Sequence, residues 1–230
     1  MSAWGLIPAA GAGERLMMHD GIPKAMRPVA GSAMFVHSLR AFDAVDAIEG
    51  AVLVVDELWM EHALSELVKE SLRIKLELIG GGPSRQASVT QGLKAVPPTV
   101  DAVVVHDAAR PLVDPQLVQR VLMALDEADG AVCAVALEDT LKRADDLVVT
   151  QTVPRDGLWR AQTPQAFRAA VLRDAHARAR EDAFEGTDDA VLVERAGGHV
   201  TLVDGDPRNV KITTVGDLAL AEMLLEEGAR

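Results

Sequence analysis

The sequence predicts an α/β fold: a doubly wound, mostly parallel β-sheet with a β-hairpin arm that projects from it. Short apolar runs, typical of strands buried on both faces, alternate with helical patterns along nearly the whole chain. Because helices separate the strands, we expect right-handed crossovers between parallel neighbours. The alternation breaks between Leu137 and Trp159, where two strand patterns flank a polar turn.

Up to Val105 the alternation predicts four strands and two helices. The expected strands are the apolar runs Ala3–Pro8, 50–55, 74–79 and 101–105. Residues 58–68 have the period of an amphipathic helix. Ser84 is placed to cap a second helix that runs to Ala95, and two prolines follow that helix.

The second half continues the same rhythm on either side of the arm. Asp114 and Pro115 begin a helix in the cap-then-proline order, and residues 131–135 form the next buried strand. Pro164 is predicted to begin a long helix that ends near Asp182. The remaining expected elements are a helix at 187–196, a strand at 200–203 and a final helix at 214–227.

The predicted arm spans about residues 137–158 and contains strands at 139–143 and 147–153 around the turn 144–146. An isolated two-stranded hairpin is only marginally stable in water. Its apolar side chains therefore need a cover, and a second copy of the chain is the simplest one. We expect a homodimer on this ground. The side chains that need cover are Leu141, Leu147, Val149 and Val153.

Composition limits the class of partner. The chain has 230 residues, 35 acidic and 23 basic, and a net charge of −12. This balance argues against a nucleic-acid or anionic-membrane surface, and the length suits a single domain, residues 1–230. Cys133 lies in an apolar run and is expected to be a buried small hydrophobe. No basic leader precedes the first apolar run and no apolar stretch approaches about 18 residues, so we expect a cytoplasmic protein.

The first strand opens into a loop of small residues followed by two basic side chains. Residues 8–15 are P-A-A-G-A-G-E-R, and Lys24 follows Pro23. A strand end with almost no side chains lets a ligand lie against bare backbone N–H groups, and Arg15 and Lys24 add the charge that a triphosphate needs. The alternative is a tight strand-to-helix turn that requires glycine. Leu16 replaces the third glycine of a dinucleotide fingerprint and no Walker-type run is present, so nucleotidyl transfer is favoured over hydride transfer.

Three further polar clusters follow later strands, at the sheet edge where α/β proteins bind ligands. They are G-G-G-P-S-R-Q-A-S at 80–88, H-D-A-A-R-P at 106–111 and D-P-R-N-V-K at 206–211. A ligand site is the interpretation that their shared edge favours. His106 is taken as structural, because no second His or Cys has ligand spacing around it.

Each cluster also has a purely structural interpretation. The glycines could form a loop before a helix, and Asp107 could be a turn residue with Arg110 as a surface ion-pair partner. Arg85 could be a solvated helix residue. Asp188 and Asp189 could be negative charges near a helix start. Ser88, Thr140, Arg155 and Lys211, taken singly, are ordinary surface or strand residues.

Taken together, the motifs resemble those of the 2-C-methyl-D-erythritol 4-phosphate cytidylyltransferase family, over essentially the full length. The family differs from this chain after Lys24, where Ala25 and Met26 stand in place of Gln and an aromatic residue, and Pro83 replaces an acidic residue of some members. The loop between Arg15 and Lys24 is also about two residues longer than usual. The motifs that carry the resemblance are P-A-A-G-x-G-x-R (8–15), P-K (23–24), G-G-x-x-R-x-x-S (81–88), V-H-D-A-A-R-P (105–111), D-T-L-K-R (139–143), G-L-W-x-A-x-T-P-Q (157–165), T-D-D (187–189) and N-V-K-I-T (209–213).

The resemblance implies a Rossmann-like nucleotidyltransferase that uses CTP and Mg²⁺ and acts as a homodimer. It implies that Arg15 and Lys24 stabilise the transition state, and that Arg155 and Lys211 position the acceptor phosphate, with Arg110 and Thr140 helping to hold the acceptor. Asp107 is implied near the metal and the ribose. The nucleotide-binding residues implied by the family are Ala9, Ala10, Gly11, Gly13, Gly81, Gly82, Ser88, Asp107 and Ala108.

Two other functions are weighed beside this one. A pentitol-phosphate cytidylyltransferase shares the CTP half of the site and differs in the acceptor. A non-catalytic nucleotide-binding module keeps the glycine loops but has no need of Arg15 and Lys24, and both are present.

Overall fold

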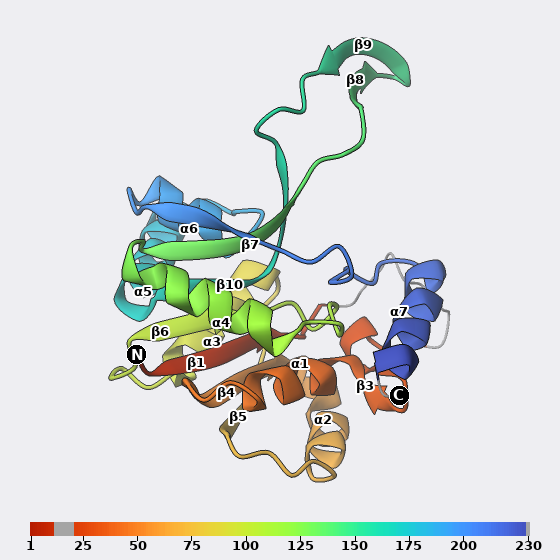
Figure 1. Cartoon of the computed structure of the whole chain (residues 1–230). Helices are drawn as coiled ribbons and strands as arrows, with labels where there is room; N and C mark the ends of the chain where they lie inside the picture. Colours follow the sequence, from red (N-terminus) through yellow and green to blue (C-terminus); the bar gives the residue numbers. More distant parts are fainter. Residues whose placement is uncertain (12–20, 229–230) are drawn as a thin grey trace.

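A seven-stranded sheet forms the centre of the molecule in the computed structural model, which describes residues 1–11 and 21–228 (Figure 1). Strand β10 is antiparallel to both of its neighbours, and the other neighbouring pairs are parallel. The predicted α/β fold with a mostly parallel sheet is confirmed. In spatial order the strands are β11 (Val200–Asp204), β7 (Gly130–Ala136), β10 (Trp159–Arg168), β6 (Ala102–Val105), β1 (Ala3–Pro8), β4 (Ile48–Val55) and β5 (Lys75–Gly80).

Helices cover both faces of this sheet. One face carries α1 (Met34–Asp43), α2 (Met60–Leu67) and α4 (Pro115–Met123), and the other carries α3 (Arg85–Ala95), α5 (Ala169–Glu181) and α6 (Asp189–Arg195). The final helix α7 (Val215–Gly228) lies beside the short strand β2 (Pro28–Val29), which pairs with β3 (Ser32–Ala33). Among the described helices, none has the length and apolarity to cross a membrane.

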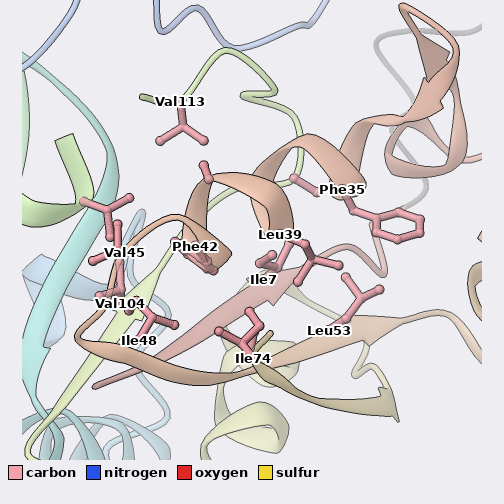
Figure 2. Close-up of a cluster of buried hydrophobic side chains, with 14 of the residues drawn as sticks. Ile7, Phe35, Leu39, Phe42, Val45, Ile48, Leu53, Ile74, Val104 and Val113 are labelled. Carbon is pink, nitrogen blue, oxygen red and sulfur yellow. The ribbon is translucent and has the colours of Figure 1, made fainter. Parts of the chain in front are cut away.

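Alternation along the strands divides the apolar side chains between two cores. In β1, Ile7 joins the core under α1 while Leu6 joins the core under α3, and Val104 and Val105 of β6 divide in the same way. Figure 2 shows the first of these cores, with Phe35, Leu39 and Phe42 of α1 lying over the sheet. Burial on both faces explains why these strands are continuous apolar runs.

Strand β10 corrects the expected helix start at Pro164. The chain stays extended from Trp159 to Arg168 between β6 and β7, and helix α5 begins only at Ala169. Proline is rarely found in a central strand because it lacks an N–H. Here the pairing with β7 is interrupted between Ala161 and Gln165, so the proline lies where the ladder is already irregular.

Helix α1 was not anticipated from the sequence. It begins after Ala33, which provides no side-chain cap, so the usual start signal is missing. Its stability comes from packing, because Phe35, Leu39 and Phe42 are fully buried.

The predicted arm is present as the hairpin of β8 (Leu141–Asp145) and β9 (Val148–Val153), which projects away from the body (Figure 1). The turn falls at Asp146 and Leu147, both with positive φ, rather than at 144–146. Leu147 is 98% exposed and Val149 57% exposed. Leu141 and Val153 are half-buried, so the apolar side chains near the tip of the arm are the ones that lack cover within one copy of the described chain.

Candidate active site

A cavity of about 480 Å³ opens at the carboxyl ends of β1, β4 and β6. Its walls come from segments that directly follow these strands and β5, which is where α/β sheets bind ligands. Two lysines, Lys24 and Lys211, complete the wall from outside the sheet. The lining residues after the strands are Pro8, Ala9, Ala10, Gly11, Asp56, Gly82, Pro83, Ser84, Arg85, Asp107, Ala108 and Ala109.

The two small-residue loops lie against each other. Ala9 N–H donates to the carbonyl of Val54 at 2.7 Å, and Gly81 N–H donates to the carbonyl of Val55 at 2.7 Å. A Cβ atom on Gly81 would overlap the Cβ of Ala10. This close approach requires glycine at position 81, because any side chain there would collide with Ala10. The two loops therefore meet the cavity with little side-chain bulk.

Ser88 closes the second of these loops. Its hydroxyl donates to the carbonyl of Ser84 at 2.9 Å, and it accepts from Gly82 N–H at 3.1 Å. Ser84 in turn caps α3 by accepting from Ala87 N–H, as the sequence predicted. Ser88 lines the cavity but is buried, so its hydrogen bonds fix the shape of the loop.

Asp107 lines the cavity and lies between two cations. Its Oδ1 accepts from Arg85 Nε at 3.0 Å and its Oδ2 from Lys211 Nζ at 2.6 Å. Burial alone raises the pKa of Asp107, but the charges of Arg85 and Lys211 outweigh it and hold the pKa well below its usual range. The carboxylate is therefore ionised at neutral pH, and both cations are fixed in the cavity wall.

Lys24 also lines this cavity. Its Nζ donates to the carbonyl of Ile212 at 2.8 Å, and Ile212 N–H donates to the carbonyl of Ala109 at 2.8 Å. The segment around residues 209–213 thus holds both Lys24 and Lys211 at the cavity. Gly13 and Arg15 lie outside the described residues.

Arg110 lies in a neighbouring cavity of about 240 Å³ that shares Arg85, Asp107 and Lys211 with the first. Its Nη1 donates to the carbonyl of Asn209 at 2.7 Å, and burial lowers the pKa of its guanidinium. The surface Asp107–Arg110 ion pair considered from the sequence is not formed, because Asp107 pairs with Arg85 and Lys211. This cavity is otherwise lined by Ala161, Gln162, Thr163, Gln165, Thr187 and Asp188.

Thr140 and Arg155 are exposed on the arm, beside β8 and β9, and neither lines either of the two cavities described above. The structure thus brings Lys24, Asp107, Arg110 and Lys211 together within one copy. It does not bring the arm residues to them within that copy.

The family model described as 2-C-methyl-D-erythritol 4-phosphate cytidylyltransferase matches residues 4–227. This chain belongs to that family. It is an enzyme of the nucleotidyltransferase class, as the motifs predicted.

Individual relatives agree over nearly the full length. The 2-C-methyl-D-erythritol 4-phosphate cytidylyltransferase of Bacillus licheniformis is 39% identical, over 98% of this chain and 96% of the relative. The one from Salinibacter ruber is 42% identical, over 95% of this chain and 91% of the relative. The crystal structure of the Thermus thermophilus protein of this name matches with a TM-score of 0.80 at 35% identity, over 98% of this chain and 100% of that one.

Some site residues of the enzyme were missed or undervalued in the sequence. Arg85 is partly buried and joins Asp107 to Asp189, rather than being solvated. Asp188 caps α6, as a charge near a helix start suggests, but Asp189 is buried. Gln162 and Gln165 line the second cavity from β10. Gln165 fell within the helix assigned from Pro164, and Gln162 stands at an unspecified position of the motif 157–165.

His106 is structural, as expected, and its hydrogen bonds define its protonation. Asp107 N–H donates to Thr163 Oγ1 at 3.0 Å, and that hydroxyl lies 3.1 Å from His106 Nδ1. Nε2 lies 3.1 Å from the carbonyl oxygen of Arg110, which can only accept, so Nε2 carries the proton. Nδ1 then accepts from Thr163, and the ring is neutral.

We expect His106 to make folding stability depend on pH. Burial lowers its pKa from 6.5 to about 4. Between these two pH values the unfolded chain binds the proton and the folded chain does not. The contribution of neutral, buried His106 to the free energy of unfolding is therefore complete above about pH 6.5 and is lost as the pH falls toward 4. The contribution is roughly 3 kcal/mol. Urea unfolding at pH 7.5 and 5 should show a smaller pH difference for His106→Gln; an unchanged difference would contradict this assignment.

Proposed function

We propose that the enzyme transfers CMP from CTP to 2-C-methyl-D-erythritol 4-phosphate. The products are 4-diphosphocytidyl-2-C-methyl-D-erythritol and pyrophosphate, in the non-mevalonate route to isoprenoids. The supporting observation is the 480 Å³ cavity, where two side-chain-poor loops meet Lys24, Lys211 and the Asp107 ion pairs. That surface combines loop backbone with positive charge for a triphosphate, although the whole chain is acidic.

In this proposal the chemistry is an in-line displacement. A phosphate oxygen of the acceptor attacks the α-phosphorus of CTP, the bond to the bridging oxygen of the β-phosphate breaks, and pyrophosphate leaves. Negative charge builds up on the α-phosphate and the leaving group, so fixed cations stabilise the transition state. We assign this role to Lys24, whose ammonium group is oriented by the carbonyl of Ile212. Arg15 is proposed for the same role from its motif position.

The nucleotide is proposed to lie along the two loops. The backbone of Ala9, Ala10 and Gly11, with Gly13 from the motif, cradles ribose and phosphates. Gly81 and Gly82 contact the cytosine edge, and Ser88 maintains the loop that does so. Asp107 and Ala108 lie at the ribose side of the cavity in this arrangement.

The acceptor is proposed to occupy the neighbouring 240 Å³ cavity. Lys211 borders both cavities and is suited to hold the acceptor phosphate next to the triphosphate. Arg110 and the polar groups of β10 line the rest. We further propose a homodimer in which the exposed arm supplies Thr140 and Arg155 to the partner's acceptor site.

Mg²⁺ is proposed to bind together with CTP. This ion is usually held by one or two carboxylates and substrate phosphates. Asp107 fits that requirement, because each carboxylate oxygen accepts a hydrogen bond from one cation and has a further lone pair. The described part of the chain has no cluster of three or more His, Cys, Asp or Glu suited to a metal, so the phosphates supply the other ligands in this proposal. When bound, the ion offsets triphosphate charge.

Pyrophosphate release, measured with each combination of two nucleotides and two acceptors, tests this function. We expect turnover with CTP and 2-C-methyl-D-erythritol 4-phosphate, and little with a pentitol phosphate. CTP should be strongly preferred over UTP, because cytosine has an amino donor for the backbone carbonyls of loop 80–82 where uracil has an acceptor.

The assay separates the parts of the proposal. Faster turnover with the pentitol phosphate would reassign the acceptor and leave the CTP half intact. Equal kcat/KM for CTP and UTP would show that loop 80–82 does not select the base. No pyrophosphate with any combination would contradict the proposed reaction.

A further inference from the structure

A buried His–Asp pair lies behind the cavity wall. The side chains of His176, on α5, and Asp189, at the start of α6, are 2% and 1% exposed. His176 Nε2 lies 3.0 Å from Asp189 Oδ1. Neither residue lines either of the two cavities described above, so neither has a role in the mechanism as described so far.

The pair connects to the site through one guanidinium. Asp189 uses its second oxygen, Oδ2, to accept from Arg85 Nη1 at 2.8 Å, and Arg85 Nε donates to Asp107 at 3.0 Å. Lys211 completes the series at the other oxygen of Asp107. His176 therefore stands at one end of a continuous series of hydrogen bonds that ends at a cavity lysine.

Asp189 needs both of its partners. Burial raises the pKa of its carboxyl, whereas Arg85 and His176 lower it further than burial raises it, so the group is ionised. His176 serves one oxygen and Arg85 the other, and leaving a buried carboxylate oxygen without its donor is costly. Removing His176 would leave Oδ1 unsatisfied, and the carboxylate would reorient or take up a proton.

His176 is itself held in place. Its Nδ1 lies 2.9 Å from Thr90 Oγ1, and that oxygen lies 2.9 Å from the carbonyl oxygen of Gln86, in the turn of α3 that follows Arg85. The same helix thus carries Arg85 and the group that orients His176. This arrangement fixes the Asp189 oxygens relative to the Arg85 backbone.

We infer that His176 is a positioning residue for the cytidylyl transfer. It orients Asp189, Asp189 orients Arg85, and Arg85 fixes Asp107 and with it Lys211 between the two cavities. This inference rests on the proposed function, in which Lys211 holds the acceptor phosphate. A small displacement of a positioned group is enough to slow such a reaction strongly.

The first test compares His176→Leu, which removes the donor, with His176→Gln, whose amide N–H can still donate to Asp189. We expect kcat/KM for the acceptor to fall about 10- to 100-fold in His176→Leu and to remain within about threefold of the wild type in His176→Gln. Leu172→Ala is the matched control, because Leu172 is fully buried on the same helix and has no part in the series. It should lower Tm without lowering kcat/KM. Equal losses in both His176 variants, or the same loss in Leu172→Ala, would overturn the inference.

A double-mutant cycle tests whether the effect passes through Arg85. In an Arg85→Ala background, His176→Leu should cause no further loss of kcat/KM, because the guanidinium that donates to both Asp189 and Asp107 is then absent. Independent, additive losses would contradict a positioning role.

A measurement without substrates separates this inference from the proposed function. The Arg85 Nε–H proton, donated to Asp107, should give a protected NMR signal in the wild type and His176→Gln. That signal should exchange faster in His176→Leu. If the Arg85 signal exchanges equally slowly in His176→Leu, the inference is overturned, whether or not the enzyme turns over CTP. If the signal changes as expected but no turnover is found, only the proposed reaction is contradicted.

Discussion

Replacing Lys24 with alanine is expected to lower kcat by about 100-fold or more, which corresponds to about 3 kcal/mol of transition-state stabilisation. The Lys24 ammonium lies on the cavity wall and is oriented by the carbonyl of Ile212 at 2.8 Å. A charge that is already oriented costs little to reorganise when the α-phosphate gains negative charge. Initial rates of pyrophosphate release at saturating CTP and acceptor measure the change.

A matched lysine variant separates this effect from a general loss of charge. Lys69 is exposed and pairs with Glu66 next to α2, so Lys69→Ala removes one positive charge away from the cavity. It should retain wild-type kcat, and circular dichroism should show that both variants are folded. Near-normal turnover in Lys24→Ala would remove Lys24 from the mechanism.

The overall architecture could be predicted because it depends on local patterns. Apolar runs such as Ala3–Pro8 are buried on both faces and appear in the sequence without interruption. Asp114 with Pro115, and Ser84, mark helix starts whose caps are present in the structure. Strand β10 was assigned wrongly because its position between β6 and β7 is a tertiary fact, and Pro164 is locally a helix-start signal.

The site could be predicted to the level of its loops but not of its contacts. Asp107 and Lys211 each follow a strand in the sequence, so their common sheet edge was expected. The ion-pair partner of each charged side chain could not be predicted, because the partners are far apart in the sequence. Lys211 and Asp107 are 104 positions apart, and so are Arg85 and Asp189. Long-range pairing of this kind depends on how the strands are ordered in the sheet, and local sequence carries no signal for it.

Mixing two inactive variants is expected to restore activity if the arm completes the partner's site. Lys24 belongs to the body, whereas Arg155 is exposed on the arm, just after strand β9. In a mixed dimer of Lys24→Ala and Arg155→Ala, one site carries both defects and the other carries neither. Random exchange gives half mixed dimers, so about a quarter of wild-type activity should return.

A second mixture provides the control. Lys24 and Lys211 line the same cavity of one body, so mixing Lys24→Ala with Lys211→Ala leaves a defect in every site and should restore nothing. Native mass spectrometry of differently tagged copies establishes that subunits have exchanged. A monomer by sedimentation, or no recovery in the first mixture despite exchange, would contradict the shared site. Equal recovery in both mixtures would contradict it as well, because two variants that each damage the body leave no intact body for the partner's arm to complete.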